Sequence, residues 1–374
     1  MYQKPDYQTA RAKAGFHWHV SGSQDALREL TGTPIREFNL NPQVCIETYR
    51  KGLPILQEMF GEDVALPGLA TPHISYGHVN GLGSELIFPE GGEVAQTHIY
   101  KSLDEGIREL KKPVNYAAAG MAPFFLDFRE KIKAAFPNQP VGFSWGLEGP
   151  ITTAFELRGH AIFTDILDDP EKAREFLRLV TDSILDFQRF RCALDQVPAM
   201  NPKGAGMCDD IASMVAPHLW PTLVLPFWEQ YFNGLTTGII SAHVEDLRSS
   251  QLQHLDTIGL SNYDPSISHK LNPEIIAREC RVPFAWRLGS FHFANLDCQD
   301  VRDFVVKAAA DGATSVFTCV ASDMCNPESV KKVHSFIAAA KEVKTRLDQG
   351  VSREQLQREV SPRGQKKFWA HWLN

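Results

Sequence analysis

His243 and Glu245 are the residues of this sequence best suited to hold a metal ion together. They follow the apolar run Gly238-Ile-Ile-Ser-Ala, and residues i and i+2 of a strand point to the same side. Cys319 closes a second such run, Ala313-Thr-Ser-Val-Phe-Thr. An imidazole, a carboxylate and a thiolate are three protein ligands, and a catalytic zinc site uses three and keeps one position open. The pattern predicts such a site, although each residue alone is equally typical of a loop or a small buried group.

Other polar residues follow predicted strands at similar positions. Glu148 stands just before Gly149-Pro150 and is a candidate proton carrier. Asp209 and Asp210 end another strand candidate, where they could orient His243 or the substrate, cap a helix or lie in a loop. Three further residues fall near predicted carboxyl ends of strands: Tyr263, Asp264 and Arg287.

The elements that must position these residues alternate along the chain. Strands are predicted at 141–145, 204–208, 239–243, 257–261, 282–287 and 315–319. Helices are predicted at 171–190, 216–235, 272–279, 298–310 and 327–347, with a short one near Leu252. This rhythm of about seven or eight β/α units predicts a TIM (β/α)8 barrel, whose active site lies at the carboxyl ends of the strands.

The flanking segments have a different character. Ser23 is a predicted cap for a helix at 24–30, and a second N-terminal helix at 42–60 is expected to bend at Pro54. Short β-prone runs between residues 73 and 100, separated by Gly and Pro, predict a hairpin excursion. Residues 348–374 form a polar tail ending in Phe368-Trp-Ala-His-Trp. This tail is expected to dock on the body of the protein or on a neighbouring subunit, as in a homodimer.

Composition narrows the class of protein. The chain has 374 residues, 43% of them hydrophobic, which suits a single domain spanning residues 1–374. Its net charge of −7 and the lack of a long basic block argue against nucleic acid and anionic membranes as partners. The first residues have no apolar core of a signal peptide, and the seven cysteines are scattered. These features predict a cytoplasmic protein with reduced thiols.

Several motifs in order resemble the uroporphyrinogen decarboxylase superfamily. They are Leu82-Gly-Ser-Glu-Leu-Ile-Phe through Lys112-Pro113, Gly149-Pro-Ile-Thr-Thr-Ala-Phe-Glu-Leu-Arg-Gly, Asp168-Asp-Pro-Glu-Lys-Ala and Asp209-Asp-Ile-Ala-Ser-Met-Val-Ala-Pro-His-Leu-Trp, followed by Leu225-Pro-Phe. The resemblance runs from about residue 40 to about 345, the core of the domain. It implies a TIM barrel.

The branch that fits better is similar to the corrinoid-dependent methyltransferases, such as the methylcobamide:coenzyme M enzymes. True decarboxylases of the superfamily use no metal and carry an arginine-rich motif near the N-terminus, which Thr9-Ala-Arg-Ala-Lys-Ala-Gly-Phe-His-Trp-His does not show. The methyltransferases have a His-x-Cys pair and a Cys followed eight residues later by Pro. Here His243-x-Glu245 and Cys319 with Pro327 match two of those three ligands, and Glu245 stands in the place of the first cysteine.

The resemblance therefore implies a zinc-dependent methyltransferase. It would move a methyl group between a small-molecule donor or acceptor and the cobalt of a corrinoid (cobalamin) on a partner protein. Zinc with one imidazole and two anionic ligands is neutral overall, so Glu245 preserves the charge that a cysteine would give, while making the site harder. The alternatives are Cys325 or Asp246 as the third ligand, a metal-free decarboxylase acting on a tetrapyrrole, and a corrinoid-binding scaffold without activity.

Overall fold

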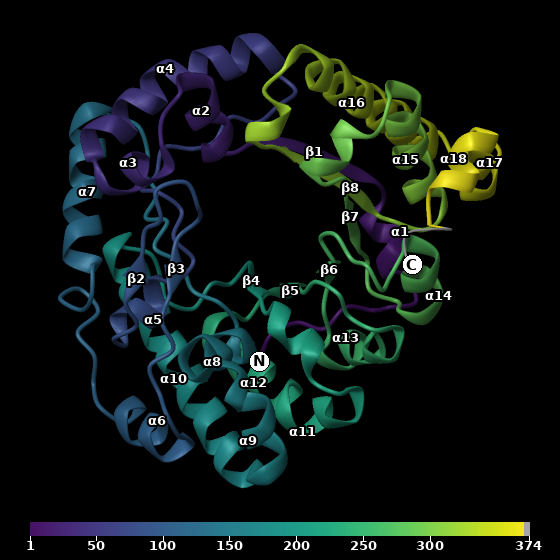
Figure 1. Ribbon diagram of the computed structural model, residues 1–374. Helices are drawn as coiled ribbons and strands as arrows, with labels where there is room; N and C mark the ends of the chain where they lie inside the picture. Colours follow the sequence, from purple (N-terminus) through teal and green to yellow (C-terminus); the bar gives the residue numbers. More distant parts are fainter. Residues whose placement is uncertain (370–374) are drawn as a thin grey trace. The chain divides into compact units, whose positions relative to one another are not determined.

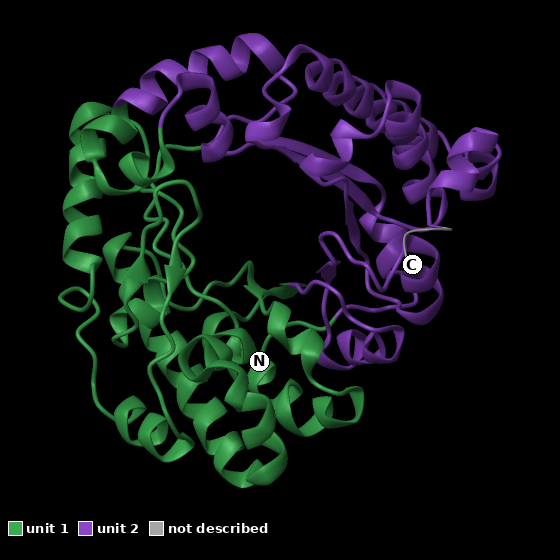
Figure 2. Cartoon of the chain, in the orientation of Figure 1, with its two compact units in different colours: residues 1–4, 34–46, 68–242 green, residues 5–33, 47–67, 243–374 purple. Residues whose placement is uncertain are grey.

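The computed structural model describes residues 1–369, which divide into two compact units (Figure 2). Unit 1 comprises residues 1–4, 34–46 and 68–242, and unit 2 comprises residues 5–33, 47–67 and the chain from His243 onward. Each unit combines helices with short β segments that pair in parallel (Figure 1). The predicted mixed α/β class is confirmed, whereas closure of the strands into an eight-stranded barrel stays a prediction.

Helices make up most of unit 1. They are α3 (Ile35–Leu40), α5 (Gly77–Gly81), α6 (Leu103–Leu110), α7 (Ala122–Ala135), α8 (Pro150–Arg158), α9 (Ile162–Asp168), α10 (Pro170–Leu194), α11 (Trp220–Leu223) and α12 (Leu225–Leu235). The long helix α10 begins directly after Asp169, whose side chain caps it by accepting from the Lys172 amide. It packs against α6, α8 and α12, so it forms the centre of the unit.

The strands of unit 1 are short. β2 (Leu86–Ile87) and β3 (Ala95–Gln96) pair in antiparallel fashion, which confirms the predicted hairpin. β4 (Gly204–Cys208) lies beside β5 (Ile239–His243), and a parallel bridge joins Asn201 to Thr236 just before them. The polar residues that follow β4 and β5 are therefore brought to the ends of neighbouring strands.

The main sheet of unit 2 joins two distant parts of the chain. β1 (His17–Gly22) pairs in parallel with β8 (Ser315–Val320), from His17 opposite Ser315 to Gly22 opposite Val320. β8 also pairs in parallel with β7 (Ala285–Arg287), and a bridge between Tyr263 and Phe284 brings β6 (Asn262–Asp264) beside β7. The carboxyl ends of β6, β7 and β8 consequently form one edge.

Helices cover this sheet and connect its strands. They are α1 (Ala10–Ala14), α2 (Gln24–Thr31), α13 (Gln253–Ile258), α14 (Pro273–Glu279), α15 (Cys298–Ala310), α16 (Pro327–Asp348), α17 (Arg353–Gln357) and α18 (Pro362–Lys367). The helix α4 (Pro42–Phe60) contributes residues to both units. The predicted cap of α2 is confirmed, because the Ser23 hydroxyl accepts from the Ala26 amide.

The C-terminal segment docks on α15, as expected for the described part of the tail. The Phe368 and Trp369 rings contact Phe304, with centroid distances of 5.6 and 5.7 Å. The Trp369 indole N–H also donates to Asp311 Oδ2 at 2.6 Å. Residues 370–374, which complete the tail, lie outside the described part of the chain.

Several predicted elements were wrong in detail. The strand expected at 257–261 does not form there, because α13 continues to Ile258 and the strand β6 begins only at Asn262. The helix expected at 216–235 is divided into α11 and α12, since Pro221 and Pro226 lack the amide proton that a continuous helix needs. The run at 141–145 makes only isolated bridges, at Gly142 and Trp145.

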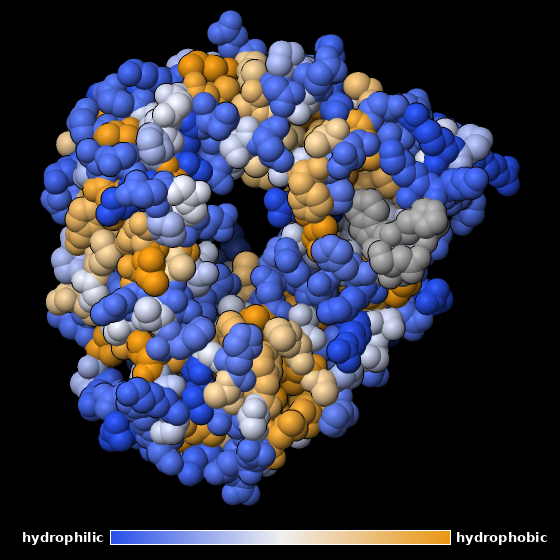
Figure 3. Space-filling model, viewed as in Figure 1, coloured by the Kyte–Doolittle hydropathy of each residue, from blue (hydrophilic) through white to orange (hydrophobic). Residues whose placement is uncertain are grey.

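The surface shown in Figure 3 mixes hydrophilic and hydrophobic residues over both units. Hydrophobic side chains exposed singly are ordinary on globular proteins. Within residues 1–369, every helix is too short or too polar to cross a lipid bilayer.

Candidate functional site

The strongest candidate site lies in unit 2, where the chain leaves β5 and β6. His243 is the last residue of β5, and Asp264 is the last residue of β6. The Val244 amide donates to the Asp264 carbonyl at 3.0 Å, so the two chain segments run side by side where they leave the strands. This pairing fixes the backbone beneath both side chains.

Asp264 orients the imidazole of His243. The Nδ1–H of His243 donates to Asp264 Oδ2 at 2.8 Å, and Asp264 Oδ1 accepts from the Ser266 amide at 2.7 Å. Because the proton is then on Nδ1, the lone pair of His243 is on Nε2. That nitrogen is 3.8 Å from Glu245 Oε1. A histidine that ligates a metal through one nitrogen commonly donates from the other to a carboxylate, so His243, Glu245 and Asp264 fit a metal ligand pair with an outer carboxylate.

Cys319 is on the same face of the sheet as other residues of this edge. Along β8, Ser315, Phe317 and Cys319 alternate with the buried Val316, Thr318 and Val320, so Phe317 and Cys319 point to one side. Arg287 is opposite Phe317 in the parallel register, and its guanidinium carbon is 6.0 Å from the Phe317 ring centroid. Cys319 therefore belongs to the face that Arg287 covers.

The three predicted ligands do not form one preassembled cluster. Nowhere in residues 1–369 do three or more His, Cys, Asp or Glu side chains lie close enough together to hold a metal ion. His243 and Glu245 are near each other, and Cys319 is outside that pair. Zinc binding by all three residues would therefore require side-chain movement.

The two alternative third ligands are engaged elsewhere. Asp246 Oδ1 accepts from the His269 amide at 2.7 Å, and its backbone has a positive φ of 55°, so this carboxylate shapes a turn. Burial, together with the nearby charges of Glu29 and Asp323, raises the pKa of the Cys325 thiol to about 11. A protonated thiol is a weak metal ligand, since the thiolate is the form that binds metals.

Asp209 occupies a buried position in unit 1. Its Oδ1 accepts from the Thr152 amide at 2.7 Å, at the start of α8, and its Oδ2 accepts from the Trp228 indole N–H at 2.6 Å. Burial raises the pKa of Asp209 to about 6, even though these hydrogen bonds favour the carboxylate. Through these hydrogen bonds Asp209 satisfies backbone amides in the first turn of α8, and its role at the active site stays a prediction.

Glu148 and Asp210 are half-buried in the same unit. The Glu148 carbonyl accepts from the Thr153 hydroxyl at 3.1 Å, which ties it to the first turn of α8. Asp210 opens the short 3-10 helix Asp210–Met214. Both remain predictions as catalytic residues.

Glu156 is the buried acid that sequence reasoning missed. It lies on α8 and is 5% exposed. In the described chain its carboxyl group makes neither a hydrogen bond nor an ion pair. Burial raises its pKa well above the usual value, and the negative charges of Glu148 and Asp209 raise it further. Glu156 is thus a buried acid near Glu148 whose neutral form the protein favours. The signal in the sequence was a glutamate within the mostly apolar run Pro150-Ile-Thr-Thr-Ala-Phe-Glu-Leu.

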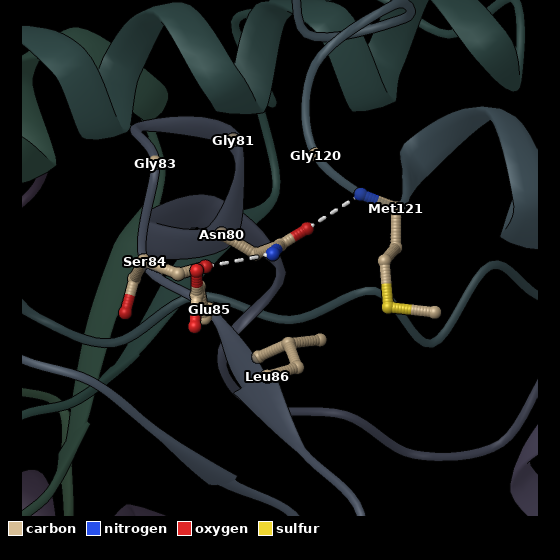
Figure 4. Close-up of a pocket in the computed structure, with 8 residues that line it drawn as sticks. All are labelled: Asn80, Gly81, Gly83, Ser84, Glu85, Leu86, Gly120 and Met121. Carbon is tan, nitrogen blue, oxygen red and sulfur yellow. Dashed lines mark hydrogen bonds between the residues drawn. The ribbon is translucent and has the colours of Figure 1, made fainter.

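A surface pocket of about 400 Å³ lies elsewhere in unit 1 (Figure 4). Asn80 is at its centre, where its Nδ2 donates to the Ser84 carbonyl at 2.8 Å and its Oδ1 accepts from the Met121 amide at 2.7 Å. These bonds join two loops and satisfy the amide on both sides. The polar groups of Asn80 in this pocket are therefore used to hold the backbone, and we assign the pocket no catalytic role.

Comparisons with known proteins were made at the levels of sequence and structure. No protein-family model matches the sequence, and no curated protein does either. Twenty-three chains of solved structures match. One is a methyltransferase from Methanosarcina mazei, with a TM-score of 0.64 and 16% identity over 91% of this chain and 99% of that chain. At this identity the likeness is one of fold, and it extends over nearly the whole of both chains.

Proposed function

We propose that the protein is a zinc-dependent methyltransferase. It moves a methyl group between a small substrate, a methyl ether, alcohol or thiol, and the cobalt of a corrinoid carried by a separate protein. His243, Glu245 and Cys319 are the zinc ligands in this proposal. The resemblance to the corrinoid-dependent branch of the uroporphyrinogen decarboxylase superfamily supports it, as does the fold shared with a protein described as a methyltransferase.

The observation that carries the proposal is the hydrogen bond of His243 with Asp264. At 2.8 Å it holds the imidazole in one orientation and leaves Nε2 directed to Glu245. An exposed loop histidine would lack a half-buried carboxylate partner of this kind, and a neutral imidazole with a fixed tautomer is what a metal ligand needs.

The chain's own residues have distinct tasks in this reaction. Zinc supplies Lewis acidity, which favours the thiolate of a thiol or polarises an ether or hydroxyl oxygen. Glu245 supplies the negative charge that a cysteine gives in the related enzymes. Its oxygen makes the ligand set harder, which favours a substrate whose methyl group is attached to oxygen.

The proposal also assigns roles to three acids of unit 1 and names the fold, the location and the partners of the protein. Glu148 carries a proton, while Asp209 and Asp210 position neighbouring groups. The strands belong to one TIM (β/α)8 barrel, as the sequence predicts, in a single domain. The protein works in the cytoplasm with its corrinoid protein, and the C-terminal tail allows a homodimer.

Metal analysis of the purified protein tests the zinc site. We expect close to one zinc per chain, a sharp loss in Cys319→Ala, and a weaker loss in Glu245→Gln, which keeps the shape and removes one charge. Cys298→Ala, which changes an exposed cysteine at the start of α15, is the matched control and should keep the metal. Protein free of zinc after growth in zinc-replete medium would refute the metal site.

A spectroscopic assay separates methyl transfer from decarboxylation. Addition of a methyl substrate should change the visible spectrum of a cobalamin as cobalt moves between its methylated and cobalt(I) states. A decarboxylase would instead release carbon dioxide from uroporphyrinogen without corrinoid. Enzymatic turnover of uroporphyrinogen would replace the methyltransferase proposal with the alternative.

A further inference from the structure

Arg287 ends β7 at the same edge as Asp264. Its guanidinium has few hydrogen-bond acceptors among the described residues. Its only hydrogen bond within residues 1–369 runs from Nη1 to Ser266 Oγ, at the long distance of 3.3 Å. The Nε–H is buried and has no acceptor in the described chain. The remaining contact is with the ring of Phe317, at 6.0 Å from its centroid.

Arg287 has no acidic partner in the described chain, unlike several other arginines of this unit. Arg281 pairs with Asp256 at 2.7 Å, Arg302 with Glu342 at 3.2 Å, and other arginines pair similarly. Within residues 1–369, Arg287 forms no ion pair with any Asp or Glu. A partly buried guanidinium whose N–H groups are incompletely hydrogen-bonded costs folding free energy, and a bound anion would supply the missing acceptors.

A continuous set of contacts joins Arg287 to the candidate metal ligand. Arg287 contacts the Ser266 hydroxyl, the Ser266 amide donates to Asp264 at 2.7 Å, and Asp264 accepts from His243 at 2.8 Å. Ser266 is fully buried and has a positive φ of 48°, so a constrained backbone holds this connection. The guanidinium and the imidazole thus belong to one rigid edge.

We propose that Arg287 binds a singly charged oxyanion, a carboxylate or a sulfonate, at the far end of the methyl substrate. The inference rests on the proposed function, because it assigns this anion to the methyl donor or acceptor. A guanidinium presents paired N–H donors that match two oxygens of such a group, and one guanidinium supplies one positive charge. The reacting end of the substrate then extends toward His243.

Equilibrium binding of two probes to the zinc-loaded protein tests the site directly. Acetate is planar and methanesulfonate is tetrahedral, and each carries one negative charge. We expect calorimetry to detect binding of at least one of them at constant ionic strength. Arg287→Gln should weaken it by about ten-fold or more, as expected for loss of a charge-assisted hydrogen bond. Arg287→Lys should keep part of it, because the charge stays and the planar pair of donors is lost.

Arg278→Gln is the matched control. Arg278 is an exposed arginine of α14 that pairs with Glu279 at 2.8 Å, so its loss removes the same charge away from the edge. We expect this variant to bind the probes as the wild type does. Zinc content is measured in every variant, because an anion held by the metal would survive Arg287→Gln with zinc unchanged, and that result would overturn the proposal.

The outcome is separable from that of the proposed function. If the wild type binds neither probe yet changes the corrinoid spectrum, the oxyanion site is wrong and methyl transfer stands. If probe binding depends on Arg287 but no methyl substrate changes the spectrum, the site stands and the methyltransferase is wrong. Should Arg287→Gln fail to fold, the Arg287→Lys protein decides, since undiminished binding of both probes by it would contradict a bidentate guanidinium contact.

Discussion

Asp264 determines which nitrogen of His243 is available to a metal. Its contribution to zinc binding can be measured by changing its carboxylate alone. Asp264→Asn keeps the size of the side chain but replaces a charged acceptor by an amide. We expect zinc affinity to fall about 10- to 100-fold, the usual effect of removing an outer carboxylate. Competition with a chelator of known affinity measures it.

Asp256→Asn is the control for that substitution. Asp256 lies on α13 and pairs with Arg281, so the change removes a partly buried carboxylate from the same unit. Its zinc affinity should equal that of the wild type. Equal affinities in the Asp264 and Asp256 variants would mean that His243 is not a ligand oriented by Asp264.

The raised pKa of Glu156 predicts how the free energy of unfolding depends on pH. Because burial raises its folded pKa above the ordinary value, the folded state holds this proton more tightly than the unfolded chain does. Its contribution to stability is complete below about pH 4.5, the unfolded value, and is lost as pH rises through the folded pKa. Glu156→Gln should therefore flatten the fall in unfolding free energy above that pH.

Urea denaturation at a series of pH values measures this slope. Asp209, with a pKa of about 6, leaves a smaller fall between about pH 4 and 6 in both proteins. Glu175→Gln, at an exposed glutamate that pairs with Lys111, serves as the control and should keep the wild-type profile. A Glu156→Gln profile as steep as that of the wild type would show that Glu156 is ionised in the folded protein.

At the scale of elements, local chemistry predicted helices better than strands. The helix at 298–310 begins and ends as expected, because Asp297 forms a capping box with Asp300. The strand β1 was missed, since His17-Trp-His-Val-Ser-Gly exposes its histidines and buries fully only Val20 and Gly22. Its partner β8 supplies the hydrogen bonds that define it, and that partner is invisible in a local window.

The C-terminal segment is held by buried acids on α15. Asp303 is fully buried, and it accepts from the Ser361 amide at 3.1 Å, from the Ser361 hydroxyl and from Gln299 Nε2 at 3.0 Å. Asp303→Ala leaves these donors without a partner, so we expect a loss of about 1–3 kcal/mol in unfolding free energy. Glu342→Ala, which breaks an exposed pair with Arg302, should cost under about 1 kcal/mol. Equal losses in the two variants would contradict a clamping role for Asp303.

At the scale of the whole molecule, unit 2 depends on both ends of the chain. The Ser23 amide donates to the Val320 carbonyl at 3.0 Å, and Ser21 is opposite Cys319 in the register of β1 and β8.

The sequence predicted that His243 and Glu245 share a side, because the i, i+2 rule is local. The hydrogen bonds of Asp264 and Arg287 depend on strand neighbours that no spacing reveals.

A truncated chain tests this dependence. A fragment of residues 1–314 lacks β8, so β1 has no partner there. We expect the amides of residues 17–22 to be protected from hydrogen exchange in the full chain and to exchange rapidly in the fragment. Deletion of residues 353–374, which leaves β8 in place, is the control and should keep protection in β1. Protected β1 amides in the 1–314 fragment would contradict the register described above.

The pairing of β1 with β8 also has a consequence for synthesis on the ribosome. Ser23 and Val320 are 297 residues apart in sequence, so at ~5–20 residues per second β1 waits roughly 15 to 60 seconds for its partner. During that interval it is an open edge that other nascent chains could join. Its alternation of His17, His19 and Ser21 with apolar neighbours makes such an edge less adhesive. We infer that these polar residues limit pairing of β1 with other nascent chains until β8 has been synthesised.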